Sequence, residues 1–331
     1  MSILTIGLTC FDQFFFVNEY PKENSKYVAT DYYESGGGPT ANAAYLLGVW
    51  GEKCFHTGYV GNDIYGERII EELKSVGVNT SLITKNVNYP TPLANITVNT
   101  DTGSRTIILR KSSHIADVSK FTIPPDLECD VILIDGREQE LSEKIIHQFP
   151  DAKVVMDGGS LRISNLQLAK LTDYMVVSES FALAHSNMKE FTTKEDLLHA
   201  LINLKKICRG YVVITLGERG CAYLDYRVLL SDLKNKSALK NINQCKDGLI
   251  VIVPSYKSKN PIDTTGAGDI FHGAFAYGVS KKWSIDKIIN FASKTAAISV
   301  GKKGVRTSIP TLDVVETSKY SKDYDFFNAE I

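Results

Sequence analysis

A short segment in the C-terminal third of the chain has residue types suited to anion binding and proton transfer. Residues 263–269 read Asp-Thr-Thr-Gly-Ala-Gly-Asp, and small and apolar residues follow them at helical spacing. This pattern predicts a helix N-terminus that follows a glycine turn. The first N–H groups of a helix lack acceptors within it, and the helix dipole is positive there, so phosphate binds at this end. An ordinary helix cap with an acidic first turn is the alternative.

Four residues of this segment are therefore candidates for chemistry. Gly266, Ala267 and Gly268 form the predicted anion hole, because glycine lets phosphate approach the backbone closely. Asp269 lies in the first turn, where a carboxylate suits the dipole and can take up a proton. His272 follows on the same helix, and we expect it to be a buried or half-buried structural residue.

Further candidate residues lie near the N-terminus. Residues 36–39 read Gly-Gly-Gly-Pro, and Asn42 follows on an expected helix. A glycine-rich turn before a helix, with Asn42 as a satisfied helix residue, also explains this segment. Asp12 follows the first expected strand, at the end of the strands where α/β sheets bind their ligands. The alternative for Asp12 is an ordinary turn residue.

Glycine turns elsewhere in the chain are less specific. Residues 213–220 run from an apolar strand-like stretch into a Gly-x-x-Gly turn, a pattern that many turns share. Residues 58–63 also contain two glycines, but they lack the G-x-G-x-x-G spacing of a dinucleotide-binding turn, and no acidic residue ends the next strand. The sequence therefore gives no support to a dinucleotide fold.

Strand-like and helix-like segments alternate along most of the chain, which favours an α/β fold with a mainly parallel sheet. Short apolar runs typical of buried strands lie at residues 3–9, 54–60, 131–134, 154–156, 174–177 and 212–216. Helical patterns lie at residues 40–49, 64–76, 140–148, 165–171, 194–207, 266–279 and 285–300. With 331 residues, the chain is long enough for one large α/β domain or two smaller ones.

Two segments break this alternation. Residues 14–35 are rich in aromatic and charged side chains. Residues 93–109 alternate between apolar and polar around an Asp-Thr-Gly-Ser turn, which predicts a β-hairpin with Ala94, Ile96 and Val98 on one face. We expect the two segments to form a small β-sheet outside the main domain.

The composition excludes several classes of protein. Lys and Arg number 37 against 38 for Asp and Glu, so no bulk attraction to nucleic acid or to an acidic membrane is expected. No apolar stretch approaches the roughly 20 residues of a membrane span. The six cysteines are scattered and form no zinc pattern, so we expect reduced thiols in a cytoplasmic protein. Residues 231–246 are polar and predict a surface loop, whereas the tail 318–331 shows no interpretable pattern.

The two glycine-rich segments together resemble the signatures of the ribokinase-like sugar kinases, also called the phosphofructokinase-B family. The C-terminal match runs from Asp263 to Gly273, the N-terminal match from Gly36 to Ala44, and the resemblance covers the chain from Gly7 to about Pro310. It implies a three-layer α/β/α domain with a discontinuous β-sheet lid over the sugar. The expected segments are 1–12, 36–92 and 112–315 for the α/β domain, 13–35 and 93–111 for the lid, and 316–331 for a tail.

The resemblance also implies an activity, transfer of the γ-phosphoryl group of ATP to a hydroxymethyl group of a sugar. By motif position Asp269 is the general base, which agrees with its place at the helix mouth. The same motifs assign sugar-binding roles to Asp12, Gly37, Gly38 and Asn42. They assign nucleotide-binding roles to Ser178, Thr215, Gly217, Gly220 and Thr264. Implied cofactors are ATP and Mg²⁺, a requirement for K⁺ is left open, and the lid often forms a homodimer interface in the family.

The chain departs from the family pattern in one place. After the expected strand at 174–177 the family usually has Asn-x-x-Glu, which helps to organise Mg²⁺ and its waters. Here Ser178 and Phe181 occupy the Asn and Glu positions, with Glu179 beside them. This difference puts the surroundings of the metal in doubt and leaves the reaction class unchanged, since Mg²⁺ is held mainly by ATP phosphates and water.

Basic residues near the expected pocket bear on the identity of the sugar. Lys26 lies in the expected lid, Arg105 follows the hairpin turn, and Arg137 follows the strand at 131–134. Convergent cations suit an anionic acceptor better than a neutral one. The pieces Ser-Lys-Tyr-Val-Ala, Gly-Gly-Gly-Pro and Phe-His-Gly-Ala also resemble the sulfofructose kinases. An anionic ketohexose, phosphorylated or sulfonated, therefore ranks slightly above a neutral sugar such as fructose or ribose.

Alternatives remain open at this point. A nucleoside or vitamin kinase is the alternative within enzymes, although Gly37, Gly38 and Asn42 favour a sugar. A non-catalytic sugar or nucleotide sensor on the same fold is the alternative of another class. The intact Asp269 and its glycine turn argue against a sensor, whereas the altered residues at 178–181 argue weakly for it.

Overall fold

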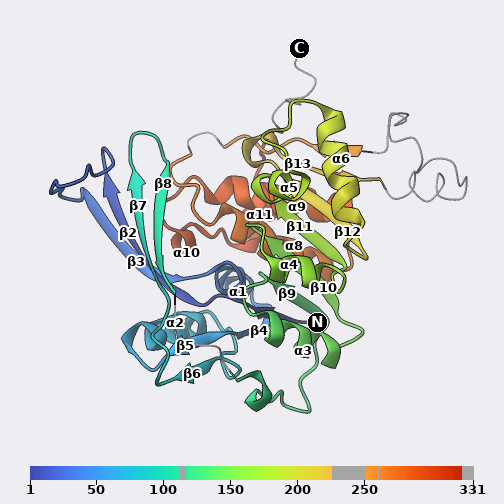
Figure 1. The fold of residues 1–331 in the computed structure, drawn as a ribbon, viewed down its shortest axis with the longest axis horizontal. Helices are drawn as coiled ribbons and strands as arrows, with labels where there is room; N and C mark the ends of the chain where they lie inside the picture. Colours follow the sequence, from blue (N-terminus) through green and yellow to red (C-terminus); the bar gives the residue numbers. More distant parts are fainter. Residues whose placement is uncertain (112–116, 226–249, 259–260, 323–331) are drawn as a thin grey trace, which may run out of the picture. The chain divides into compact units, whose positions relative to one another are not determined.

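The computed structural model describes residues 1–111, 117–225, 250–258 and 261–322. Its contacts divide the chain into two compact units, Met1–Ala152 with Ser258–Ser318, and Lys153–Lys257 with Lys319–Ile331. Figure 1 shows the helices and strands along the chain. The loop expected at 231–246 lies outside the described residues, as does most of the C-terminal tail.

The first unit contains part of an α/β sheet and the second, smaller sheet. Its strands are β1 (Ser2–Ile6), β2 (Cys10–Val17), β3 (Asp31–Gly37), β4 (Lys53–Thr57), β5 (Tyr59–Gly61), β6 (Thr84–Asn86), β7 (Leu93–Asn99), β8 (Arg105–Arg110) and β9 (Val131–Ile134). Its helices are α1 (Pro39–Val49), α2 (Ile64–Ser75), α3 (Gln139–Gln148), α8 (Ala267–Ser280), α9 (Ile285–Ser299), α10 (Val305–Ser308) and α11 (Leu312–Thr317), with a short 3₁₀ turn at Val118–Lys120.

Strand β1 is the centre of the parallel part of this unit. It pairs in parallel with β4 on one side and with β9 on the other. All five of its residues are buried, including the polar Ser2 and Thr5, which explains why its sequence does not alternate strictly between apolar and polar residues. Helices α1 and α8 pack against β1 and against each other. The α/β layer therefore places the N-terminal ends of α1 and α8 in the same unit.

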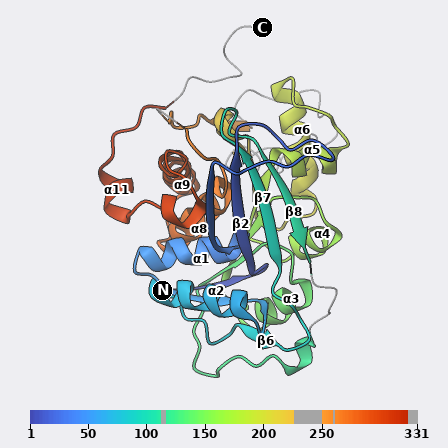
Figure 2. The same cartoon turned by 90° about the vertical axis from the view of Figure 1, so that its left-hand side faces the viewer.

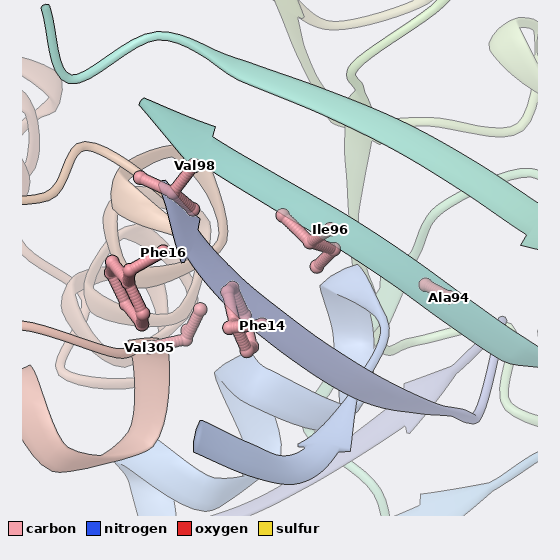
Figure 3. Packing of buried hydrophobic residues seen from close by; sticks show 6 residues of the cluster. All are labelled: Phe14, Phe16, Ala94, Ile96, Val98 and Val305. Carbon is pink, nitrogen blue, oxygen red and sulfur yellow. The ribbon is translucent and has the colours of Figure 1, made fainter. Parts of the chain in front are cut away.

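Strands β2, β3, β7 and β8 form a separate four-stranded sheet in the order β3-β2-β7-β8, which we call the lid sheet. Figure 2 shows β2, β7 and β8 side by side, with α1 and α2 near one end of the sheet. As predicted, 93–109 is a hairpin, and Ala94, Ile96 and Val98 share one buried face. They pack with Phe14, Phe16 and Val305, as Figure 3 shows. The lid sheet therefore has an inner face that contacts the first turn of α10.

The second unit continues the alternation of strands and helices. Its elements are β10 (Lys153–Gly158), α4 (Ile163–Ala169), β11 (Tyr174–Ser178), α5 (Glu179–Ser186), α6 (Lys194–Lys205), β12 (Tyr211–Thr215), a 3₁₀ turn (Gly217–Arg219), β13 (Cys221–Leu224) and β14 (Ile250–Val253). Strands β10, β11 and β12 pair in parallel, whereas β13 and β14 are antiparallel additions beyond β12. The mainly parallel α/β class predicted from the alternating pattern is therefore confirmed.

Two boundaries differ from the prediction near the N-terminus. The first strand ends at Ile6 rather than at residue 9, and the lid strand β2 already begins at Cys10. Asp12 therefore lies within β2, where it pairs with Ser35 of β3 and Ala94 of β7. The alternative of a turn residue at Asp12 is therefore wrong, because Asp12 lies inside a strand and its side chain is buried. Of the described helices, none has the length and apolar character needed to cross a membrane.

Candidate active site

The predicted anion hole lies at the N-terminus of α8, after a turn that requires glycine. Gly266 precedes the helix with φ 74°, a left-handed conformation in which an added Cβ would also overlap the Val305 side chain. The buried Asp263 holds this turn, because its Oδ1 accepts from Thr265 N and its Oδ2 from Gly304 N, both at 2.9 Å. The turn is therefore fixed from both sides by one carboxylate.

The three predicted donors of the anion hole are not equivalent. Gly268 is exposed, and an added Cβ there would meet no heavy atom within 4 Å, so its backbone faces open space. The N–H of Ala267 instead donates back to Thr264 O at 3.3 Å, which closes the turn. The N–H of Gly268 is thus the more accessible donor, whereas the N–H of Ala267 closes the turn in this conformation.

Asp269 lies one residue further, in the first turn of α8, and meets a residue from the other signature segment. Asn42 Nδ2 donates to Asp269 Oδ2 at 2.7 Å, although the two residues are 227 positions apart in the sequence. The helices approach closely because Gly273, one turn after Asp269, lies against Ala43: a Cβ added to Gly273 would be 3.1 Å from Ala43 Cα. Gly273 therefore brings the helix that carries Asn42 against the helix that carries Asp269.

Asp12 is a buried carboxylate beside the second glycine cluster. A Cβ added to Gly37 would overlap the Asp12 carboxylate, so only glycine fits opposite it. The Cys10 thiol donates to Asp12 Oδ1 at 3.1 Å. The pKa of Asp12 is raised to about 6, mainly by burial and to a lesser extent by the charge of Glu72, against the opposing effects of the Cys10 hydrogen bond and the charge of Arg306. Asp12 thus lies in surroundings that disfavour its charged form.

Gly38 caps the N-terminus of α1 and cannot be replaced without strain. It has φ 103°, and an added Cβ would overlap the carbonyl oxygen of Leu8. Pro39 follows at the first helical position, where its missing N–H costs nothing. The Gly-Gly-Gly-Pro run therefore lets the lid strand β3 pass directly into α1, with Asn42 in the first turn of that helix.

Two residues of this site, Arg306 and Glu72, were not predicted, because no motif in the sequence singles them out. Arg306, on α10, is buried, and its Nε donates to Asn42 Oδ1 at 3.4 Å. Its Nη1 donates to Glu72 Oε2 of α2 at 2.5 Å, and the same oxygen accepts from Gly36 N at 2.9 Å. A lone arginine in a short segment of mixed polarity and a glutamate on an amphipathic helix are both ordinary surface patterns. The available clue was weak: Arg306 follows Val305 directly and precedes Ile309 and Pro310 by a few residues.

The predicted cations are only partly brought to the site. Arg105, at the start of β8, donates from Nη1 to Thr264 Oγ1 at 3.2 Å, so it lies at the turn before the anion hole. Arg137 is half-buried, and its charge lowers the pKa of Cys10, against the larger effect of burial, which places Arg137 near Cys10. Lys26 is exposed in the segment between β2 and β3. The structure thus associates Arg105 and Arg137 with the site, whereas within the described part of the chain no hydrogen bond or ion pair joins Lys26 to these residues.

The predicted nucleotide residues other than Thr264 lie in the second unit. Thr215 ends β12 and donates to Val177 O at 3.3 Å, and Gly217 (φ 61°) and Gly220 (φ 94°) bound the 3₁₀ turn after it. Ser178 caps α5, because its Oγ accepts from Phe181 N at 3.1 Å.

The departure from the family pattern also has a structural counterpart. Glu179 forms an ion pair with Arg219 of the 3₁₀ turn, so it is held by protein rather than presented as a metal ligand. Within the described part of the chain, His, Cys, Asp and Glu do not gather in threes that would hold a metal ion. The buried His272 bonds through Nδ1 to Gly268 O at 2.6 Å, and this is the structural role expected for it.

Comparison with known proteins identifies the family. Residues 1–312 match the sequence model of the pfkB family carbohydrate kinases. The chain is 25% identical to the ribokinase of Bacillus subtilis over 322 residues, covering 95% of this chain and 98% of the relative. It is 24% identical to a deoxyribokinase of Salmonella typhi over 327 residues, covering 95% and 97%. The chain therefore belongs to the pfkB family of carbohydrate kinases.

Solved structures agree on the fold. A putative ribokinase from Agrobacterium tumefaciens superimposes with a TM-score of 0.79 at 22% identity, covering 95% of this chain and 96% of that chain. Ribokinase from Arabidopsis thaliana, solved with ribose and ATP, gives a TM-score of 0.74 at 21% identity, with 95% and 97% covered. The fold is thus ribokinase-like, and the family makes the protein an ATP-dependent carbohydrate kinase rather than a non-catalytic sensor.

Proposed function

We propose that this kinase transfers the γ-phosphoryl group of ATP to a hydroxymethyl group of a sugar, with Asp269 as the general base. The observation that carries the proposal is the hydrogen bond between Asn42 and Asp269, which joins the two signature segments at one point. The sugar lies between the lid sheet and the N-termini of α1 and α8. Asp12, the N–H groups at Gly37 and Gly38, and Asn42 hold its hydroxyl groups.

The reaction follows from the groups at the mouth of α8. Asp269 accepts the proton of the hydroxymethyl group as its oxygen attacks the γ-phosphorus, and the bond from that phosphorus to the β,γ-bridging oxygen breaks to release ADP. The N–H of Gly268 and the dipole of the helix stabilise the charge on the transferred group. Loss of one such donor in comparable sites costs about 3–4 kcal/mol in the transition state. The lid sheet excludes water, which limits hydrolysis of ATP.

Magnesium fits this site as a cation carried by the nucleotide. Mg²⁺ keeps several waters and binds one or two carboxylates together with substrate phosphates, so a dedicated protein cage is not required. The pairing of Glu179 with Arg219 agrees with this arrangement, since it removes one carboxylate from the ligand set. The metal neutralises phosphate charge when bound. A dependence on K⁺ belongs to the proposal as well, and comparing turnover in K⁺ and Na⁺ buffers tests it.

For the acceptor we propose an anionic ketohexose whose acidic group lies at the end remote from the reacting hydroxyl. The support is the charge around Arg137. The pKa of the adjacent Glu138 is raised to about 7, mainly by burial and also by the charge of Asp135, against the opposing charge of Arg137. Because this environment disfavours the charged form of Glu138, that carboxyl offsets less of the positive charge beside it, which leaves more of this charge for an acidic acceptor. A neutral pentose is the second candidate, because the relatives named above are ribokinases and a deoxyribokinase.

The base is tested by the variant Asp269→Asn, which keeps the shape of the side chain and removes its ability to accept a proton. We expect sugar-dependent ADP release to fall by about 10²–10⁴-fold, with little change in the KM for ATP. Asp286→Asn, in the first turn of α9, serves as the matched control and should keep full turnover. Wild-type turnover in the Asp269→Asn enzyme would refute the proposed mechanism.

A panel of acceptors tests the sugar. It contains ribose, fructose, a nucleoside, a hexose phosphate and a sulfonated hexose, each measured with saturating ATP. We expect the highest kcat/KM with an acidic ketohexose, and Arg137→Ala should raise the KM for that acceptor by about 10–100-fold, the value of a charge-assisted hydrogen bond. Lys26→Ala is measured beside it. If both variants leave the KM of every acidic acceptor unchanged, or if a neutral pentose leads the panel, the anionic preference is wrong.

A further inference from the structure

Arg306 is a buried cation that the proposed reaction does not use directly. Its side chain is only 3% exposed. Its three nitrogens have different surroundings: Nε faces Asn42, Nη1 faces Glu72, and Nη2 is buried with no partner among the described residues. The centre of its guanidinium lies 5.0 Å from the Tyr45 ring. A charge in such a place is costly, and hydrophobic residues of similar volume are often neutral or stabilising replacements for a buried ion pair.

The hydrogen bonds of Asn42 show what Arg306 does there. The two ends of an asparagine amide are nearly equal in shape, and one donates while the other accepts. A guanidinium only donates, so the end of the amide that faces Arg306 must be the oxygen. The NH₂ end then faces Asp269, to which it donates at 2.7 Å. In the flipped amide, donor would meet donor at Arg306 and acceptor would meet acceptor at Asp269.

The same guanidinium is tied to the end of a lid strand. Glu72 Oε2 accepts both from Arg306 Nη1 and from Gly36 N of β3, at 2.5 Å and 2.9 Å. A Cβ added to Gly36 would overlap the guanidinium, so the strand backbone lies directly against it. A displacement of this end of β3 therefore displaces Arg306. The neighbouring Val305 contacts both Gly266 and the apolar inner face of the lid sheet.

We propose that Arg306 is a positioning residue, which fixes the amide of Asn42 so that its NH₂ group holds the carboxylate of Asp269 in place for proton transfer, and which links this geometry to the lid through Glu72 and Gly36. The inference rests on the proposed role of Asp269 as the base. Arg306 touches neither reacting atom, so it acts through Asn42. The contacts run from Gly36 in the lid sheet through Glu72, Arg306 and Asn42 to Asp269.

The variants Arg306→Met and Arg306→Lys test this assignment. Methionine fills the volume without charge, and lysine keeps a cation for Glu72 but lacks the Nε donor at the position facing Asn42. We expect both to lower kcat by about 10²-fold, the effect of a small misplacement of a catalytic group, while the KM for ATP stays unchanged. Arg68→Met is the control, because Arg68 also joins α2 to β3 through an ion pair, with Glu34, but makes no contact with Asn42. It should keep the wild-type kcat.

Coupling to Asn42 separates positioning from a structural role. Asn42→Ala lowers kcat by itself, and we expect Arg306→Lys to cause no further loss in that background, since both changes break one chain of contacts. The proposal is overturned if the losses in kcat of the two single variants multiply in the double variant. It is also overturned if Arg306→Lys keeps the wild-type kcat with its melting temperature unchanged. Asp269→Asn is measured in parallel: if it retains full turnover, the proposed base falls and the positioning role falls with it. An inactive Asp269→Asn enzyme with independent effects at residues 306 and 42 refutes the positioning role alone.

Discussion

At Asp12 the proposed role in sugar binding and the stability of the fold oppose each other. The carboxylate is buried, and its pKa in the folded protein is about 6 rather than the ordinary 3.8. The folded state therefore binds protons more tightly than the unfolded chain at this site, and ionisation destabilises the fold. This cost is absent below pH 3.8, grows between 3.8 and about 6, and is complete above about 6. The difference in pKa corresponds to about 3 kcal/mol.

We therefore expect Asp12→Asn to raise the free energy of unfolding at pH 8 by up to about 3 kcal/mol and to have little effect near pH 4. The same variant should raise the KM for the sugar, because a charged acceptor of hydroxyl hydrogen bonds is lost. Urea unfolding at the two pH values measures the first effect. Asp31→Asn is the control, since Asp31 of β3 is exposed and paired with Lys303, and it should give no gain. A gain for Asp12→Asn that is equal at both pH values would contradict the argument.

The sequence identified residues that carry a recognisable local pattern. A helix start after a glycine turn indicates Asp269 and Gly266, and a glycine run before a helix indicates Asn42. Arg306 and Glu72 carry no local pattern, because what defines them is a contact between segments more than 200 positions apart. Lys26 lies exposed in the segment between β2 and β3, and its neighbours in the sequence resemble a family motif, so its role in binding the sugar stays a prediction.

The lid sheet is held in place from its inner face. In-register pairs put Phe14, Ile96 and Ile107 in one row and Phe16, Val98 and Arg105 in the next. Figure 3 shows the buried members of the first two strands in these rows, with Val305 among them: Phe14, Phe16, Ile96 and Val98. The period of two in 93–99 was sufficient to predict this face, since alternation assigns every side chain of a strand to a side. The contact with α10 was not predictable, because a four-residue helix leaves no periodic signal.

Arg105 is the polar residue on that inner face, and its position predicts what the hairpin contributes to the reaction. Because its guanidinium bonds to Thr264 beside the anion hole, we expect it to neutralise charge on the transferred phosphoryl group rather than to bind the far end of the sugar. Arg105→Ala should then lower kcat by about 10–100-fold with a smaller change in the KM for the sugar. Steady-state kinetics with both substrates varied measure this split.

The control for this experiment lies at the other end of the same strand. Arg110 donates from Nη2 to Thr91 O at 2.8 Å, so Arg110→Ala removes a lid arginine without touching the turn at Thr264. It should keep the wild-type kcat. If Arg105→Ala instead raises the KM of the sugar at constant kcat, Arg105 binds the acceptor, as its place in the sequence first suggested.

On the scale of the whole molecule, the residues that meet around Asp269 all belong to the first unit, although they come from both ends of the chain. The alternation of elements was enough to predict the α/β class, because it depends on local patterns. The division into units was not predictable in the same way. Val305 and Arg306 pack on the lid sheet and on α1, and such long-range contacts, rather than composition, decide which segments belong together.

The outer face of the lid sheet gives the prediction for assembly. Phe15 and Tyr32 pack there with ring centroids 5.0 Å apart, and Ile108 on the edge strand β8 is 69% exposed. An edge strand with exposed apolar side chains favours pairing with another chain, and closed pairs of identical chains are the commonest assembly.

We expect a homodimer through this face, and Ile108→Asp should shift the mass in solution from two chains to one. Ile64→Asp on α2 is the matched control, because Ile64 is also 69% exposed, and it should leave the dimer intact. Light scattering after size exclusion gives the masses, and a wild-type enzyme of one-chain mass, or a dimer that survives Ile108→Asp, would show that the lid does not form the interface.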